Sequence, residues 1–310
     1  MPKNLLIGSI INYNWDDIAI FFNSYQQAGF ENCECVMFTG NMSKHTIDRI
    51  RACGVEVLPI PEKFAGGCVI DYRWELYRDY LRRHVEDYSM VFTADVRDAF
   101  FQADVFKHYE GKDAFLGIAL EDGDLTQPCN KNWLINRYGE KVWKSVKDNR
   151  IICTGTVWAT SKEFLAFASE MVKQINSDKY PYFRVCDQAV GNYLIYYDNM
   201  FPDLLRPSTN YDGCVMTIAL TDAKDIHIDS QGFILNGKGE IAAVVHQYDR
   251  KLELVKMIHK KYGQGMTIFG KLAKTCANNT VRRIARFIVN IRKKGFLRVA
   301  VEAIQRRIHH

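Results

Sequence analysis

The stretch LLIGSIINYNWDDIAIFFNSYQQAG, residues 5–29, joins two patterns that indicate the class of fold. Its first seven residues form a short apolar run, which is typical of a buried strand. Residues 16–28 then have helical spacing and stop at Gly29, a residue that favours the carboxyl end of a helix. The stretch therefore predicts a strand that is followed directly by a helix.

The same alternation continues along the chain. Further strands are predicted at 35–38, 55–60, 89–93, 115–119, 152–159 and 242–246. Further helices are predicted at 43–52, 72–85, 162–174 and 187–199. Strands that alternate with helices form a parallel sheet covered on both faces. We therefore expect an α/β fold with a mixed, mostly parallel sheet flanked by helices.

The composition indicates a folded chain without a membrane span. The 310 residues are 47% hydrophobic and 25% charged, which is enough apolar material for a sizeable core. No apolar run approaches the ~20 residues of a spanning helix, and the opening run is too short for a signal peptide. We therefore expect a cytoplasmic protein. The nine cysteines include no CxxC spacing, which argues against a zinc knuckle or a disulfide framework.

The charge is divided unevenly along the chain. From Met266 to the end there are eleven Lys and Arg against Glu302 alone, so this segment carries +10 and residues 1–265 carry −5 of the net +5. Apolar residues recur at helical spacing between Val281 and Ile291, and residues 296–308 begin a second such pattern. A basic amphipathic helix is typical of association with an anionic membrane surface.

The chain is accordingly predicted to have a catalytic domain at 1–265 and a basic, helical membrane-association tail at 266–310, peripheral on the inner face of the membrane. The alternative for the tail is that its apolar stripe docks on the catalytic body. Few aromatic residues accompany the basic cluster, so no nucleic acid partner is expected.

The residues that carry chemistry follow a central strand. In VFTADVRDAFFQ, residues 91–102, Asp95 and Asp98 come directly after an apolar run. Ligands of open α/β sheets bind at the carboxyl ends of strands, and a carboxylate pair suits a cation that also grips a diphosphate. The alternative is that Asp98 caps a short helix. His246 ends a late apolar strand and would complete a three-ligand set for Mn²⁺.

The chain resembles the nucleotide-sugar-dependent glycosyltransferases of the GT-A fold, a Rossmann-like fold, and within them the retaining type of glycogenin and the lipooligosaccharide galactosyltransferases. The matching motifs occur in the family's order and are DYRWELYRDYL (71–81), TADVRD (93–98), CTGTVWAT (153–160), CDQAVGNYL (186–194) and VVHQYD (244–249). One departure is the spacing DxxD, since Arg97 stands where a strict DxD has its second acid.

The resemblance implies a metal site and a donor site. Asp95, Asp98 and His246 would hold Mn²⁺ or Mg²⁺ on the nucleotide diphosphate. Arg78 would contact the donor, and it is preferred over Arg73 because the two point about 140° apart on one helix.

The remaining implied site residues follow other strands or begin a helix. Asn12 and Tyr13 would receive the nucleotide base, and Thr154 and Gly155 would approach the donor sugar. Asp187 would bind sugar hydroxyls and Gln188 would lie at the reacting face; the alternative for Asp187 is a helix N-cap. The segment 121–131 is a candidate lid or acceptor loop.

The predicted function is that of a metal-dependent glycosyltransferase. It would transfer a sugar, with retention, from a nucleotide diphosphate donor such as a UDP-sugar to a lipid-linked, lipopolysaccharide or polysaccharide acceptor. Two alternatives stay open: a nucleotide-sugar pyrophosphorylase or phosphosugar transferase, and a non-catalytic adaptor that binds membrane or RNA.

Overall fold

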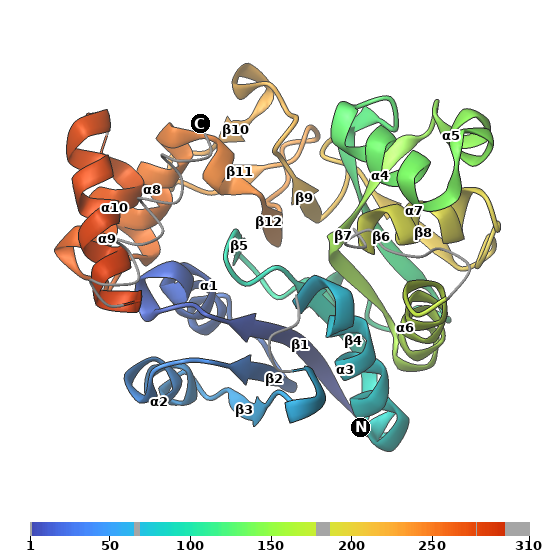
Figure 1. Ribbon diagram of the computed structural model, residues 1–310, viewed down its shortest axis with the longest axis horizontal. Helices are drawn as coiled ribbons and strands as arrows, with labels where there is room; N and C mark the ends of the chain where they lie inside the picture. The colour runs from blue at the N-terminus through green and yellow to red at the C-terminus, as the bar shows by residue number, and fades with distance from the viewer. Residues whose placement is uncertain (1, 65–68, 178–186, 277, 295–310) are drawn as a thin grey trace, which may run out of the picture.

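A computed structural model describes residues 2–64, 69–177, 187–276 and 278–294. Within these residues a seven-stranded sheet has the order β3-β2-β1-β4-β7-β6-β8 (Figure 1). Its strands are β1 (Lys3–Ile11), β2 (Cys33–Gly40), β3 (Glu56–Pro59), β4 (Tyr88–Ala94), β6 (Leu116–Asp124), β7 (Arg150–Thr160) and β8 (Leu205–Ser208). All pairings are parallel except those of β7, which runs antiparallel to β4 and β6. The predicted mixed, mostly parallel sheet is confirmed.

Helices cover both faces of this sheet (Figure 1). The larger helices are α1 (Trp15–Gln27), α2 (Lys44–Ala52), α3 (Val69–His84), α4 (Pro128–Tyr138), α5 (Glu140–Val146), α6 (Ser161–Ile175), α7 (Asp187–Tyr196), α8 (Leu252–Tyr262), α9 (Ile268–Thr275) and α10 (Asn279–Lys294). Leu6 and Ile10 of β1 pack with α1 and α8, whereas Leu5 and Ile7 pack with α3 and α6. Alternate residues of one strand therefore serve two cores, which explains why β1 reads as a continuous apolar run.

The opening strand and helix form as their sequence predicts. Asn14 caps α1 by accepting a hydrogen bond from the Asp17 N–H, and the Asp17 carboxylate accepts one from the Asn14 N–H. This reciprocal arrangement satisfies two N–H groups that have no partner inside the helix. Gly29 follows the helix at φ 68°, a left-handed conformation that glycine adopts without strain.

A second, smaller sheet was not anticipated from the sequence. It has the order β5-β12-β9 and consists of β5 (Ala99–Phe101), β9 (Val215–Thr217) and β12 (Val244–His246). Strand β12 runs antiparallel to β5 and parallel to β9, with His246 opposite both Ala99 and Thr217. This sheet lies beyond the carboxyl end of β4 and brings the late segment of the chain back to the central strand. A short hairpin of β10 (His227–Ile228) and β11 (Ile234–Leu235) extends from it.

The segment predicted as a loop at 121–131 is mostly regular structure. Strand β6 continues to Asp124 and α4 begins at Pro128, so only a short turn joins them. Thr126 stabilises this turn by donating its N–H to the Asp124 carboxylate at 2.9 Å. The expectation of a loop across 121–131 is therefore corrected, because most of this segment belongs to β6 and α4.

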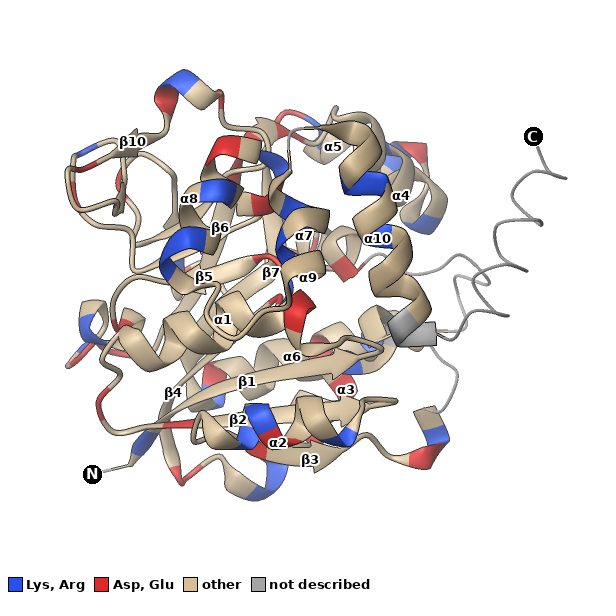
Figure 2. Ribbon diagram, turned by 90° about the vertical axis from the view of Figure 1, so that its left-hand side faces the viewer, with Lys and Arg blue, Asp and Glu red and all other residues tan. Residues whose placement is uncertain are grey.

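The start of the basic segment packs on the rest of the described fold. Met266 belongs to the core, and the Thr267 N–H donates to the Asp16 carboxylate at 2.8 Å. Lys274 donates to the backbone carbonyls of Asp16 and Asp17 at 2.7 and 3.2 Å. In two perpendicular views α9 lies beside α1 (Figures 1 and 2). Residues 266–276 are thus continuous with the body, while the second amphipathic segment at 296–308 lies outside the described residues.

No helix within the described ranges is both long and apolar enough to cross a membrane.

Candidate metal centre and donor site

Two sheets place three potential metal ligands together. Asp95 follows the last residue of β4, and its N–H donates to the Gly155 carbonyl on β7 at 2.8 Å. Asp98 immediately precedes β5, and its carbonyl accepts from the Gln247 N–H at 2.8 Å. Because β5 pairs with β12, His246 is held beside Asp98. The position of His246 thus depends on strand pairing and not on a loop.

The geometry of this cluster suits a divalent cation. His246 Nε2 lies 3.7 Å from Asp95 Oδ2 and 3.5 Å from Asp98 Oδ1, and one ligand atom from each residue falls within 4.8 Å of the others. His246 is 1% exposed, and Nε2 has no hydrogen-bond partner among the described residues. The three side chains thus converge on one point, and one imidazole nitrogen with two carboxylates is a ligand set that suits Mn²⁺.

Neighbouring cations keep both carboxylates ionised. Burial alone would raise the pKa of Asp95, but the charge of Arg73 and the contact with His246 hold that pKa well below its usual range. Burial likewise opposes ionisation of Asp98, yet His246 and Arg97 lower the pKa of that carboxyl. Arg97 lies 3.0 Å and Arg250 3.7 Å from Asp98 Oδ2. Both acids are therefore available as anionic ligands.

Gly155 leaves the space that the cluster needs. A Cβ at this position would meet the His246 ring and would lie 2.9 Å from both His246 Nε2 and Asp95 Oδ2. Real Cβ atoms do not approach other atoms so closely, so the absence of a side chain is what allows the ligands to converge.

Gly155→Ala is therefore expected to weaken Mn²⁺ binding by roughly 10- to 100-fold, because displaced ligands lose affinity on the scale known for the shell around a metal. Isothermal titration of the chain with Mn²⁺ measures this. Gly123→Ala is the control, since its Cβ would crowd the flexible end of the exposed Leu220 side chain at 2.7 Å and would lie 3.4 Å or more from Gln127 and Ile151. Unchanged affinity in Gly155→Ala, with the fold intact by circular dichroism, would contradict the assignment of this cluster.

Arg73 links the metal cluster to Asp187. Its Nη1 lies 2.5 Å from Asp95 Oδ1 and its Nε donates to Asp187 Oδ2 at 2.8 Å. The Trp74 indole N–H also donates to Asp187 Oδ2, at 2.9 Å, and the Thr154 hydroxyl lies 3.3 Å from Asp187 Oδ1. Asp187 is 4% exposed and begins α7. Its carboxylate is thus held by side chains of two other elements and stands next to Asp95.

The structure places Arg73, and not the preferred Arg78, beside the candidate metal ligands. Arg78 donates to Asp79 at 2.8 Å and lies 3.7 Å from Glu75, so its partners are on its own helix. Arg73 is 9% exposed and faces the carboxyl end of β4. The two side chains do point in different directions, as the helical period requires. The packing of α3 on the sheet decided which one faces the site.

Gln188 is held by two residues that the sequence did not single out as ligands or catalysts. Its side-chain amide donates to Asn130 Oδ1 at 2.9 Å and lies 3.4 Å from Glu121 Oε1. Glu121 is 4% exposed, and burial raises its pKa. Glu121 could have been identified from the sequence as a candidate site residue, because it ends the apolar run of β6 just as Asp95 and His246 follow or end buried strands.

Asn12 and Tyr13 lie at the end of β1. Asn12 is exposed at φ 60°, donates its N–H to the Gly40 carbonyl at 3.2 Å and accepts from the Asn41 side chain. Burial raises the pKa of the half-buried Tyr13, and the charges of Arg97 and Asp95 also act on its phenol. Tyr13 is thus half-buried at the end of β1, while Asn12 lies on the solvent side.

No protein-family model and no curated protein matches the chain. Two solved structures of LgtC are similar to it, each with 12% sequence identity. One is of an active-site mutant, with a TM-score of 0.48 over 78% of this chain and 86% of that one. The other is of the galactosyltransferase LgtC in complex with donor and acceptor sugar analogues, with a TM-score of 0.49 over 90% of this chain and 99% of that one.

Proposed function

We propose that this chain is a metal-dependent glycosyltransferase of the GT-A fold that uses a nucleotide diphosphate sugar, in the first place a UDP-sugar. The observation that carries the proposal is the convergence of Asp95, Asp98 and the unpartnered Nε2 of buried His246 at the carboxyl end of a central strand. That edge of an open α/β sheet is where ligands bind. Hard anionic oxygens and one imidazole suit Mn²⁺ or Mg²⁺.

The residues around the cluster could bind the nucleotide and stabilise the negative charge of the diphosphate that leaves the sugar. When bound, the cation would supply charge stabilisation for the phosphate oxygen that departs from the sugar. Arg250 lies beside Asp98 and is 46% exposed in its side chain, so its guanidinium can turn to the same phosphates. Tyr13 offers an aromatic face for the base next to the cluster, and Asn12 offers an amide at its edge. In this proposal the nucleotide lies across the carboxyl ends of the neighbouring strands β1 and β4.

Asp187 and Gln188 are proposed to act on the donor sugar. Asp187 has its carboxylate fixed by Arg73 and Trp74, so it can accept hydrogen bonds from sugar hydroxyls without reorganising. Thr154 and Gly155 line the same approach. Gln188, held by Asn130 and Glu121, would present its amide oxygen at the reacting face and stabilise positive charge that develops on the sugar. Transfer would then proceed with retention of configuration.

Incubation of the purified chain with a panel of UDP-sugars, Mn²⁺ and a glycan or glycolipid acceptor tests this function. UDP release and sugar transfer are expected, and both should stop in EDTA. Full activity in EDTA would overturn the metal assignment. Formation of pyrophosphate from UTP and a sugar 1-phosphate would point to a pyrophosphorylase, and no turnover with any donor would favour a non-catalytic adaptor.

The acceptor is proposed to be lipid-linked or of the lipopolysaccharide or polysaccharide class, with the enzyme held at the inner face of a membrane. Helix α10 supports this location because Val281, Ile284 and Phe287 are 40%, 55% and 44% exposed on a helix that also carries Arg282, Arg283 and Arg286. Apolar side chains exposed to this degree can enter the interface while arginines meet anionic headgroups.

The double variant Ile284→Asp/Phe287→Asp is expected to lower binding to phosphatidylglycerol vesicles by at least about tenfold. Burial of each large apolar side chain contributes about 1.5–3 kcal/mol, and the new carboxylates repel the surface. Vesicle co-sedimentation measures the loss, and wild-type binding should weaken as salt rises. Tyr211→Asp is the control, since Tyr211 is 65% exposed and lies outside α10. An equal loss in the control, or none in the double variant, would contradict the anchor.

A further inference from the structure

The Nδ1 side of the His246 ring faces two buried polar side chains. Thr217 is on β9, opposite His246 in the pairing with β12, and its Oγ1 lies 3.4 Å from Nδ1. Cys153 is on β7, and its Sγ lies 3.5 Å from the same nitrogen. Thr217 is 0% and Cys153 1% exposed. Strands of two different sheets therefore hold an oxygen and a sulfur against this nitrogen.

The hydroxyl proton of Thr217 is directed away from His246. Thr217 donates to the Gln247 side-chain oxygen at 3.0 Å. A hydroxyl has one proton and two lone pairs, so Oγ1 can accept a hydrogen bond from the ring but has no proton left to give it. Gln247 is itself held in place, because its backbone N–H donates to the Asp98 carbonyl at 2.8 Å.

The thiol proton of Cys153 also has another acceptor. Burial raises the pKa of Glu121, and hydrogen bonds from the Cys153 and Gln247 side chains oppose this rise. While the thiol donates to Glu121, its sulfur can only accept from His246. Glu121 Oε1 also lies 3.4 Å from the Gln188 amide nitrogen. One buried carboxylate thus joins the surroundings of His246 to the proposed reacting face.

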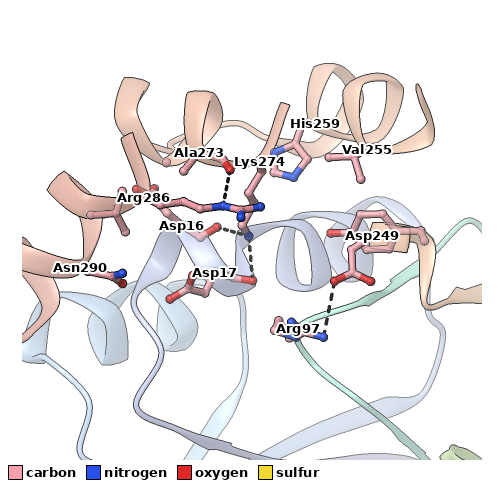
Figure 3. Close-up of a pocket in the computed structure, with 13 residues that line it drawn as sticks. Asp16, Asp17, Arg97, Asp249, Val255, His259, Ala273, Lys274, Arg286 and Asn290 are labelled. Carbon is pink, nitrogen blue, oxygen red and sulfur yellow. Dashed lines mark hydrogen bonds and ion pairs between the residues drawn. The ribbon is translucent and has the colours of Figure 1, made fainter. Parts of the chain in front are cut away.

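The other ring nitrogen, Nε2, faces the carboxylates. Asp98 Oδ1 lies 3.5 Å from it. The second oxygen of Asp98 is occupied by Arg97 at 3.0 Å, and Arg97 also pairs with Asp249 at 3.5 Å (Figure 3). A histidine that binds a metal is neutral and presents a lone pair to the ion. If Nε2 is the ligand atom, the single ring proton therefore has to be on Nδ1.

We propose that Thr217 and Cys153 are positioning residues for the metal centre. Both can accept the Nδ1 proton of a neutral His246, and the proton of each is given to another residue. Together they select the tautomer whose Nε2 lone pair points to the cation. This role rests on the metal centre of the proposed function, but it does not depend on transferase activity.

Titration of the full chain with Mn²⁺, without donor, tests this role. Thr217→Val keeps the shape of the side chain and removes the hydroxyl, so Mn²⁺ affinity is expected to fall by roughly 10- to 100-fold. Thr217→Ser retains the hydroxyl and should restore wild-type affinity. Thr156→Val is the matched control and should bind as wild type. It makes the same change at a 0% exposed threonine whose hydroxyl has no partner among the described residues.

Electron spin-echo spectra of the Mn²⁺-loaded protein give a readout that a purely structural role would not change. Wild type and Thr217→Ser should show modulation from an imidazole nitrogen bound to the ion. Thr217→Val should show weaker modulation even at saturating Mn²⁺. Absence of the nitrogen signal in the wild type, or wild-type affinity and signal in Thr217→Val, would overturn the proposal. An equal loss of affinity in Thr156→Val would do the same.

Three further variants replace Thr217→Val if that protein does not fold. Cys153→Ala removes the second acceptor and should weaken Mn²⁺ binding, whereas Cys153→Ser retains one and should not. Gln247→Met frees the Thr217 hydroxyl to donate to Nδ1, so it should also weaken binding; Gln247 is only half-buried. Wild-type affinity in both Cys153→Ala and Gln247→Met would contradict the proposal. Because no donor is needed, a chain that binds Mn²⁺ through His246 and transfers no sugar would refute the proposed function alone.

Discussion

Asp95→Ala and His246→Ala are each expected to lower Mn²⁺-dependent sugar transfer by about 1,000-fold or more. Both side chains lie in the cluster whose ligand atoms fall within 4.8 Å of one another. A cation at a departing phosphate contributes several kcal/mol to the rate, and about 1.4 kcal/mol is a factor of ten. Transfer assays with and without Mn²⁺ measure the effect, and nucleotide binding should lose its metal dependence in both variants.

The fold is expected to survive Asp95→Ala. Asp95 and Asp98 are like charges on either side of one imidazole, so removal of one carboxylate relieves repulsion, and Arg73 keeps Asp187 as a partner. Asp98→Ala should be similarly damaging, because Asp98 lies closer to His246 Nε2 than Asp95 does. Asp79→Ala, on the outer face of α3, is the control and should transfer normally. Full metal-dependent activity of Asp95→Ala would contradict the metal centre.

Asp187→Asn is expected to lower the turnover number about 100-fold while changing the affinity for UDP by less than about threefold. The proposed role of Asp187 is to hold the donor sugar. UDP lacks this sugar, so the loss of the interaction should lower the rate of transfer and leave the binding of UDP nearly unchanged. Steady-state kinetics and titration with UDP and Mn²⁺ separate the two quantities. Asparagine is nearly isosteric, so Trp74 retains an oxygen to which it can donate.

Arginine variants provide the matched comparison for this prediction. Arg73→Gln should lower turnover at least as much as Asp187→Asn and should also weaken metal-dependent UDP binding, because Arg73 contacts both Asp187 and Asp95. Arg78→Gln should keep wild-type turnover, since Arg78 pairs along its own helix in the described contacts. Equal losses of turnover and UDP affinity in Asp187→Asn would indicate that Asp187 has a structural role at the start of α7 and does not contact the donor sugar. An inverted anomeric centre in the product would count against the role of Gln188.

Much of this site could be predicted because its ligands end strands. Asp95 and His246 each follow an apolar run, and the carboxyl ends of strands are where an α/β sheet exposes polar groups. Glu121 also ends an apolar run, but the residues after it are rich in Asp, Gly and Pro, and this composition favours a loop. In the fold, β6 passes through it to Asp124. Local composition could not show that the pairing of β6 with β7 extends this far.

The sequence was sufficient to predict the alternation of strands and helices, because each element has its own local period of apolar residues. It also showed directly the uneven charge and the acids that follow β4. The tertiary structure alone decided that α3 turns Arg73 and not Arg78 to the site, that β5 and β12 pair to bring His246 to Asp98, and that α9 packs on α1. These arrangements depend on contacts between segments that are far apart in the chain. The packing of whole helices and strands sets the geometry of these contacts, and it produces no periodic pattern in the sequence of either segment.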